Sequence, residues 1–206
     1  TDFIAQYYEK HPDITVTFRL MTRREIWESL ENNRIDLAVM YLPDDSIKNW
    51  KPYESRKIFD EELLYLHHGA KLEGKKRISF EQTANYPWVS YPSDYFLSHL
   101  LGETYKNQLV TMPDPVARFT TPYQLAKFSN MTHVNTALPS SFYGAHKDDI
   151  EAEASQFKPG IHFELSFVYR RGKDQIPRIA GFLDQFKEYL DEKDYFARIS
   201  ATRGRL

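Results

Sequence analysis

The stretch from residue 14 to residue 42 constrains the fold most, because it has the pattern of a strand, a helix and a second strand. Apolar and polar side chains alternate from Ile14 to Leu20, which is the period of a strand with one buried face. Thr22-Arg23-Arg24-Glu25 forms a capping box that predicts a helix start. The apolar run from Ile35 to Leu42 predicts a buried strand. Two strands joined by one helix and short links share a sheet only as a right-handed parallel crossover, so the sequence predicts an α/β fold.

The same order of pieces recurs along the chain. The first ten residues have the pattern of the second half of a helix that stops at His11-Pro12-Asp13, so we expect further residues upstream. Two more capping boxes, at Ser79 and Thr121, predict helix starts. The polar stretch from Lys147 to Gln156 is expected to be a connection. Other helices are predicted over residues 95–106 and 176–190, and strands over 58–66, 88–91, 110–119, 132–138 and 163–169.

The composition excludes several classes of protein. Hydrophobic residues make up 41% and charged residues 27% of the 206 residues, as in a globular domain and unlike a disordered segment. A formal net charge of -2 gives the chain itself no electrostatic reason to hold nucleic acid. The sequence has no cysteine, which excludes disulfides and thiolate metal sites and suits a reducing cytoplasm. No apolar stretch reaches the roughly 18 residues that a membrane-spanning helix needs.

The motifs of common enzymes are absent. The sequence has no glycine-rich phosphate loop, no His-Glu-x-x-His and no Gly-x-Ser-x-Gly turn. His67 and His68 are adjacent, so on a strand they point to opposite faces and cannot chelate one ion together. We therefore expect no catalytic residue, no metal site and no cofactor.

Two motifs near the start of the chain carry a family resemblance. The helical segment that ends in His11-Pro12-Asp13-Ile14 leads into a strand, a capped helix and then Ile35-Asp36-Leu37-Ala38-Val39. This order resembles the effector-binding domain of LysR-type transcriptional regulators. The resemblance covers nearly the whole chain, through a strand ending in Leu138-Pro139, a strand ending in Arg170-Arg171 and a closing helix.

The resemblance implies a fold, a function and partners. The fold would be α/β, with two Rossmann-like lobes and a ligand cleft between them, of the type 2 periplasmic-binding-protein kind. Lobe I would be residues 1–57 and 171–206, and lobe II residues 58–170. The chain would be the sensing and oligomerisation domain of a cytoplasmic regulator that binds DNA only through a winged helix-turn-helix absent from this sequence. The alternative is a solute-binding protein of the same fold that delivers a small molecule to a transporter.

The resemblance also implies a homodimer or homotetramer. Tyr7 and Tyr8 together give the first helix a larger aromatic surface than one lobe needs to bury. We expect this surface to lie beside Thr15 and Thr17, on the polar face of the predicted first strand. Such a surface suits a partner chain. The alternative is that both tyrosines pack inside the lobe.

The candidate ligand-binding residues follow the predicted strands. Free amides at helix starts favour anions, so we expect a small, anionic effector. Hydroxyls at these places are in the first instance helix caps, and the two tyrosines suit cleft-wall packing equally well. The resemblance implies effector contacts at Thr22, Tyr41, Ser93, Tyr95, Thr120 and Thr121, with Arg23 close to the first of them.

Overall fold

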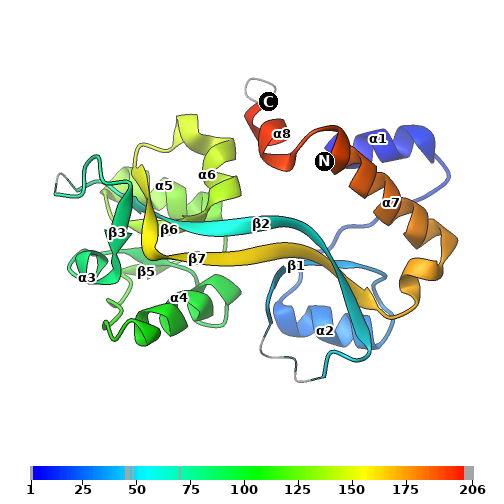
Figure 1. The fold of residues 1–206 in the computed structure, drawn as a ribbon, viewed down its shortest axis with the longest axis horizontal. Coiled ribbons are helices and arrows are strands. Elements are labelled where there is room, and N and C mark those ends of the chain that lie inside the picture. Colours follow the sequence, from blue (N-terminus) through cyan, green and yellow to red (C-terminus); the bar gives the residue numbers. More distant parts are fainter. Residues whose placement is uncertain (1, 45–46, 48, 70, 202–206) are drawn as a thin grey trace. The chain divides into compact units, whose positions relative to one another are not determined.

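The computed structural model describes residues 2–44, 47, 49–69 and 71–201, and the chain in it divides into two compact units. Unit 1 comprises Thr1–Phe59 and Glu164–Arg198, and the body of unit 2 is Asp60–Phe163. Two long strands, β2 (Tyr53–His67) and β7 (Glu153–Arg170), pass through both units and are neighbours in one sheet (Figure 1). The chain therefore changes units within these two strands.

Unit 1 is a layered structure around the end of β7. Its strand β1 (Ala38–Leu42) pairs antiparallel with β7, so that Ala38 lies opposite Val168. Val168 is fully buried on the face that packs against α2 (Arg23–Glu31), whereas Phe167 and Tyr169 point to the other face and pack against α7 (Pro177–Glu192). The period of two along a strand thus divides the apolar residues of β7 between two helices.

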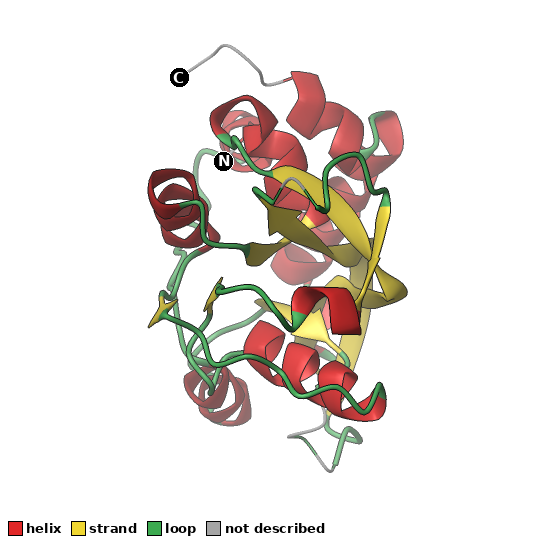
Figure 2. Ribbon diagram, turned by 90° about the vertical axis from the view of Figure 1, so that its left-hand side faces the viewer, coloured by secondary structure: helices red, strands yellow, loops and turns green. Residues whose placement is uncertain are grey.

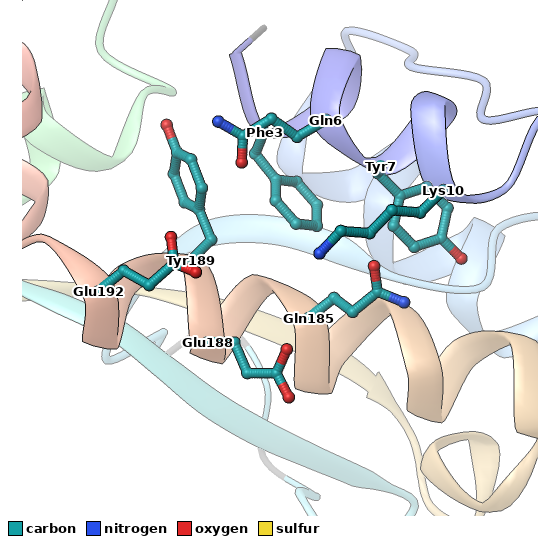
Figure 3. Close-up of a pocket in the computed structure, with 8 residues that line it drawn as sticks. All are labelled: Phe3, Gln6, Tyr7, Lys10, Gln185, Glu188, Tyr189 and Glu192. Atoms are coloured by element: carbon teal, nitrogen blue, oxygen red, sulfur yellow. The ribbon is translucent and has the colours of Figure 1, made fainter.

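Helix α1 (Asp2–Lys10) packs on α7 through aromatic rings. The Phe3 ring lies edge-on to Phe186, with centroids 4.8 Å apart, and Tyr7 lies edge-on to Phe182 at 5.1 Å. Figure 3 shows Phe3 and Tyr7 pointing from α1 toward α7. Burial raises the pKa of the Tyr7 phenol. Of the two tyrosines expected at a partner surface, Tyr7 is instead buried inside unit 1, whereas Tyr8 is 62% exposed.

The predicted strand from Ile14 to Leu20 is wrong. The described residues 11–22 contain no strand, and β1 has its ladder with β7, antiparallel, and none with this segment. The supposed buried face is open, since Phe18 is 68% exposed and Leu20 is 101% exposed. The alternating pattern lacks a neighbour to pair with, and a strand exists only where its backbone groups have one.

Unit 2 has a mixed arrangement of parallel and antiparallel strands. The strand β6 (Thr136–Pro139) pairs antiparallel with β2, and β3 (Arg77–Ser79) pairs parallel with β7. A separate pair, β4 (Val89–Ser90) and β5 (Ala117–Arg118), is parallel. Unit 2 also contains α3 (Phe80–Thr83), α4 (Phe96–Asn107), α5 (Pro122–Thr132), α6 (Ser140–His146) and a 3-10 turn at Lys147–Asp149. A second 3-10 turn, Lys173–Gln175, lies in unit 1, where α8 (Tyr195–Ala201) also begins.

Several boundaries differ from the predictions. The strand β7 already begins at Glu153, inside the stretch predicted as a polar connection. Its first buried position is the polar Ser155, so the sequence shows no apolar alternation there. The expected strand over 110–119 shrinks to two residues, in keeping with the two prolines that precede them. The α/β class itself is confirmed, since helices and strands follow one another along the chain. Figure 2 distinguishes the two kinds of element by colour. None of the helices in the described ranges is long and apolar enough to span a bilayer.

Candidate functional site

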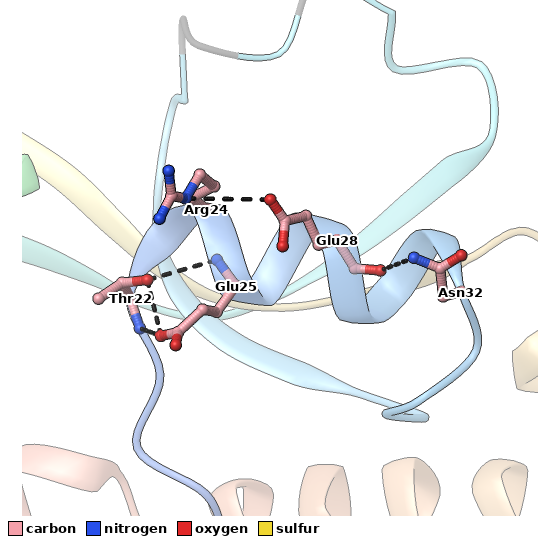
Figure 4. A network of polar contacts seen from close by, with 5 residues as sticks. All are labelled: Thr22, Arg24, Glu25, Glu28 and Asn32. Carbon is pink, nitrogen blue, oxygen red and sulfur yellow. Dashed lines mark hydrogen bonds and ion pairs between the residues drawn. The ribbon is translucent and has the colours of Figure 1, made fainter.

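In unit 1 the predicted capping box at Thr22 is confirmed (Figure 4). The Thr22 amide donates to Glu25 Oε2 at 2.7 Å, and the Glu25 amide donates to Thr22 Oγ1 at 3.4 Å. The Thr22 hydroxyl also donates to Glu25 Oε2, at 2.7 Å. These hydrogen bonds, the one from the hydroxyl first, lower the pKa of the Glu25 carboxyl. The start of α2 therefore already carries a carboxylate of its own.

Arg23 is held by a buried carboxylate that the sequence did not single out. Its Nε lies 2.8 Å from Asp44 Oδ2, and its Nη2 donates to the Tyr41 carbonyl oxygen at 3.2 Å. The indole Nε1 of Trp27 donates to the same Asp44 oxygen at 2.8 Å. The Asp44 side chain is fully buried, while that of Arg23 keeps 23% of its surface exposed. The structure thus brings Thr22, Arg23 and Tyr41 to one end of α2, with Asp44 fixing the guanidinium.

In unit 2 the other candidates follow the parallel pair β4 and β5. Ser90 lies opposite Arg118 in this pair, and the Phe119 amide donates to the Ser90 carbonyl oxygen at 3.0 Å. Because the two strands are parallel, the segments after them leave from the same edge. That edge carries the candidates Ser93, Tyr95, Thr120 and Thr121.

Ser93 is not a helix cap, contrary to the prediction. Helix α4 begins at Phe96, with Tyr95 at the cap position and no side-chain cap hydrogen bond. Ser93 is an exposed residue of the preceding turn, and the half-buried Tyr95 ring stacks parallel to that of Tyr91 at 6.4 Å. Pro92 starts the turn, and the Tyr95 amide closes it by donating to the Pro92 carbonyl oxygen at 3.0 Å.

Thr121 caps α5, but only half of the expected capping box forms. The Gln124 amide donates to Thr121 Oγ1 at 3.2 Å, as predicted. The Gln124 side chain does not reach back to the Thr121 amide; its Oε1 accepts from the Thr121 hydroxyl at 3.0 Å and from the Thr120 hydroxyl at 3.4 Å. The first turns of α4 and α5 contain no acidic residue, in contrast to the first turn of α2.

Ser90 is a candidate that sequence reasoning missed. It is 2% exposed, and its hydroxyl has no hydrogen-bond partner among the described residues. A buried hydroxyl usually has a partner, so one without any at the end of a strand marks a place where a ligand or water can bind. Its only signal in the sequence is a serine that ends an apolar strand just before a turn.

The two adjacent histidines point to different neighbours, as predicted. The His67 ring lies 3.0 Å from Ser155 Oγ of β7, and the His68 ring lies 3.0 Å from Ser129 Oγ of α5. Burial lowers the pKa of both imidazoles. Within the described residues no group of three or more histidine, aspartate or glutamate side chains is arranged to hold a metal ion.

The comparisons with known proteins agree with this architecture. The family described as "LysR substrate binding domain" matches residues 1–191. No curated protein sequence matches the chain. Similar solved structures include an H2O2-bound mutant of OxyR from Corynebacterium glutamicum, with 13% sequence identity and a TM-score of 0.76. The match covers 98% of this chain but only 62% of the OxyR chain, which is longer.

Two further structures are isolated domains with a bound ligand. The regulatory domain of CcmR from Synechocystis, in complex with 2-PG, has 13% identity and a TM-score of 0.79, with 91% of this chain and 89% of that one covered. The effector-binding domain of QuiR, in complex with shikimate, has 14% identity and a TM-score of 0.69, with coverage of 98% and 90%. Identities this low show a shared fold, whereas the family match extends over nearly the whole sequence. The chain belongs to the family of LysR substrate binding domains.

Proposed function

We propose that this chain is the ligand-sensing and oligomerising domain of a cytoplasmic LysR-type transcription regulator, and that its effector is a small anion. The observation that carries the proposal is the family match over residues 1–191. DNA binding would come from a winged helix-turn-helix outside this sequence. The solute-binding alternative is less favoured, because the matching family is that of the regulators. No enzyme activity is proposed.

The two units would contribute different chemistry to the effector. In unit 1 the charge of Arg23 is matched by Asp44, and Glu25 already sits at the start of α2. Unit 1 would therefore contact hydroxyl or carbonyl groups, through Thr22, Arg23 and Tyr41. In unit 2 the first turns of α4 and α5 have no carboxylate, so their amides are better placed to meet the anionic end of the effector. The proposed contacts there are Ser93, Tyr95, Thr120 and Thr121, with the buried Ser90 added to them.

A thermal-shift panel tests the proposal. The probes are 2-phosphoglycolate, shikimate, simple carboxylates and amino acids. A ligand at a hundredfold excess over its Kd stabilises the folded chain by about 2.7 kcal/mol. The double variant Thr22→Val with Thr121→Val should lose most of the best ligand's shift, measured against its own unliganded melting temperature, because the lost caps lower that temperature by themselves. The exposed Thr111→Val is the matched control. An unchanged shift in the double variant would place the site elsewhere.

The proposed oligomer can be tested separately. Tyr8 is 62% exposed on α1, and Thr15 and Thr17 are exposed on the following segment, a surface that suits a second copy of the chain. In a twofold contact one substitution acts twice, so Tyr8→Glu should dissociate the dimer in light scattering. Tyr123→Glu, at a tyrosine that is 60% exposed in unit 2, should leave it intact. A wild-type chain that is monomeric at tens of micromolar contradicts the proposal.

A further inference from the structure

Glu61 is a buried carboxyl group of unit 2 that none of the proposed contacts involves. It lies in β2, at the start of that strand's course through unit 2, and is 2% exposed. Acidic side chains are almost never this buried unless they are paired. Glu61 nevertheless forms no ion pair with any lysine, arginine or histidine in the described part of the chain.

The two oxygens of this carboxyl group have very different surroundings. Oε1 accepts hydrogen bonds from the Ser140 hydroxyl and from the Ser141 and Glu62 amides, the latter two at 3.1 Å. Oε2 is buried as well, yet it has no hydrogen-bond partner among the described residues. The short helix α6 is therefore capped through one oxygen, and the packing of unit 2 leaves the other oxygen unexplained.

The open Oε2 makes the folded state less stable than it could be. A buried polar atom without a partner costs free energy, and a charged one costs more. A glutamine at this position would accept the same hydrogen bonds through its own oxygen and would bring no charge into the interior. The carboxyl group is therefore explained by a donor that the described residues do not supply.

The pairing of strands places Glu61 at the edge of unit 2 that carries the candidate ligand contacts. Leu63 lies opposite Pro139, the last residue of β6, so Glu61 lies just beyond the end of that strand. β6 runs parallel to β4, since Trp88 and Asn135 just before them form a parallel bridge, and β4 runs parallel to β5. All three strands thus end at one edge, and Glu61 lies there with the segments that follow β4 and β5.

This edge offers a ligand two opposite kinds of polar group. The first turns of α4 and α5 contain no acidic residue and present main-chain amides, which suit an anion. The first turn of α6 is already taken by Glu61 through the Ser141 amide. What remains there is Oε2, which suits a hydrogen-bond donor. A ligand that satisfies the whole edge therefore has an acidic group at one place and a donor at another.

We propose that Glu61 determines the specificity of the effector site by binding a protonated amine, and that the effector is therefore an amino acid or a related zwitterion. An ammonium group donates to Oε2 and also balances the charge of an ionised carboxylate, whereas a hydroxyl group only donates. Because β6 lies between β2 and β4, the groups that meet the amine and the acid are roughly 10 Å apart. The amine and the acid are then separated by several bonds along the ligand. The inference rests on the proposed function and names the class of its effector.

Compounds that differ only in the amine test this inference by isothermal titration calorimetry on the 206-residue chain. The amine-bearing probes are 4-aminobutyrate, 5-aminovalerate and lysine. Their counterparts without that amine are butyrate, valerate and norleucine, and 4-hydroxybutyrate carries a hydroxyl group in its place. The tightest-binding amine should bind at least about tenfold more tightly than its counterpart, because the counterpart lacks a hydrogen bond between charged groups.

Glu61→Gln separates the roles of the two carboxyl oxygens. The glutamine oxygen still accepts from Ser140 and Ser141, while an amide nitrogen that only donates replaces Oε2. The preference for the amine should disappear in this variant, and the affinity for the amine-free counterpart should stay within about twofold. Glu62→Gln is the matched control, because Glu62 is the next residue of β2 and its side chain accepts from Gln156 at 3.0 Å instead. It should keep the preference.

Urea unfolding of the unliganded variants distinguishes a binding residue from a structural one. Because Oε2 has no partner among the described residues, Glu61→Gln should leave the urea midpoint unchanged or raise it. A lower midpoint together with an unchanged preference for the amine would make Glu61 a structural residue and overturn the inference.

Three binding results would also overturn the inference. Equal affinity for the amine-bearing and amine-free probes would remove the amine and leave the anionic effector standing. Equal affinity for 4-hydroxybutyrate and 4-aminobutyrate would mean that a neutral donor suffices. Binding of no compound in the panel at about 10 mM would contradict the proposed function together with the inference.

Discussion

Replacing Asp44 tests whether one buried carboxylate organises the end of α2. Asp44 is 2% exposed and is the common partner of the Trp27 indole and the Arg23 guanidinium, each at 2.8 Å. Asp44→Ala leaves both donors without their acceptor. We expect the free energy of unfolding to fall as a result, and the tryptophan fluorescence to report it, because the Trp27 ring lies edge-on to Trp50 at 5.4 Å.

The size of the effect follows from the two contacts. Removing one member of a buried charge pair costs about 3–5 kcal/mol, which is reduced here because Arg23 keeps some exposure to water. An orphaned buried indole N–H costs about 1–3 kcal/mol. Since the two contacts share one oxygen atom, we expect a total loss of about 3 kcal/mol. For a chain of this length that corresponds to a melting temperature lower by about 6–12 °C.

The assay is urea unfolding of wild type, Asp44→Ala, Asp44→Asn, Arg23→Gln and the double variant of Arg23→Gln with Asp44→Ala. Asp44→Asn keeps an acceptor for Trp27 and removes only the charge, so it should cost about half as much as Asp44→Ala. The double variant should cost about 1 kcal/mol or more below the sum of the single ones, because the two residues act on each other. A loss under about 1 kcal/mol for Asp44→Ala, or strict additivity, refutes the reasoning.

Three other predictions concern stability. Burial lowers the pKa of His67 and His68 below 6.5, so near that pH the unfolded state binds more protons than the folded state. The free energy of unfolding should therefore be constant above about pH 6.5 and fall below it. Urea midpoints measured between about pH 7.5 and 5.5 check this, and the fall should be smaller in His67→Gln. Leu101→Ala, at a fully buried site, should cost about 2–5 kcal/mol in urea unfolding, and Leu109→Ala, at a leucine that is 95% exposed, under about 0.5 kcal/mol; equal losses would contradict the assigned burial. Thr22→Ala should lose about 1 kcal/mol, which Thr22→Ser should largely restore, and a null effect of both would mean that the hydroxyl does not cap α2.

The helices were largely determined by the sequence. Helix start signals are local, because a cap residue and its partner lie three positions apart. The box at Thr22 and the proline after Thr121 therefore predicted α2 and α5 correctly. The apolar stripe of the last helix gave α7 to within two residues at its C-terminal end. The cap at Ser93 failed because the tight turn at Pro92 delays the helix.

The candidate site was determined in part. The sequence named Thr22, Thr120 and Thr121, which lie at helix starts, and the resemblance placed them in a ligand-binding role that stays a prediction. The sequence did not single out Asp44 or Ser90. A carboxylate in a turn and a serine at a strand end are ordinary residues until their burial is known.

Pairing between strands was decided only by the tertiary structure. Residues 14–20 alternate as in a strand, and residues 35–42 form an apolar run typical of a buried strand. Only Ala38–Leu42 is paired, and its partner is the antiparallel strand β7, some 125 residues further along the chain. A period of two shows that a segment can present an edge; it carries no information on which other segment will lie beside that edge. Residues 14–20 therefore have the period of a strand without being one, because no other segment in the described part of the chain pairs with them.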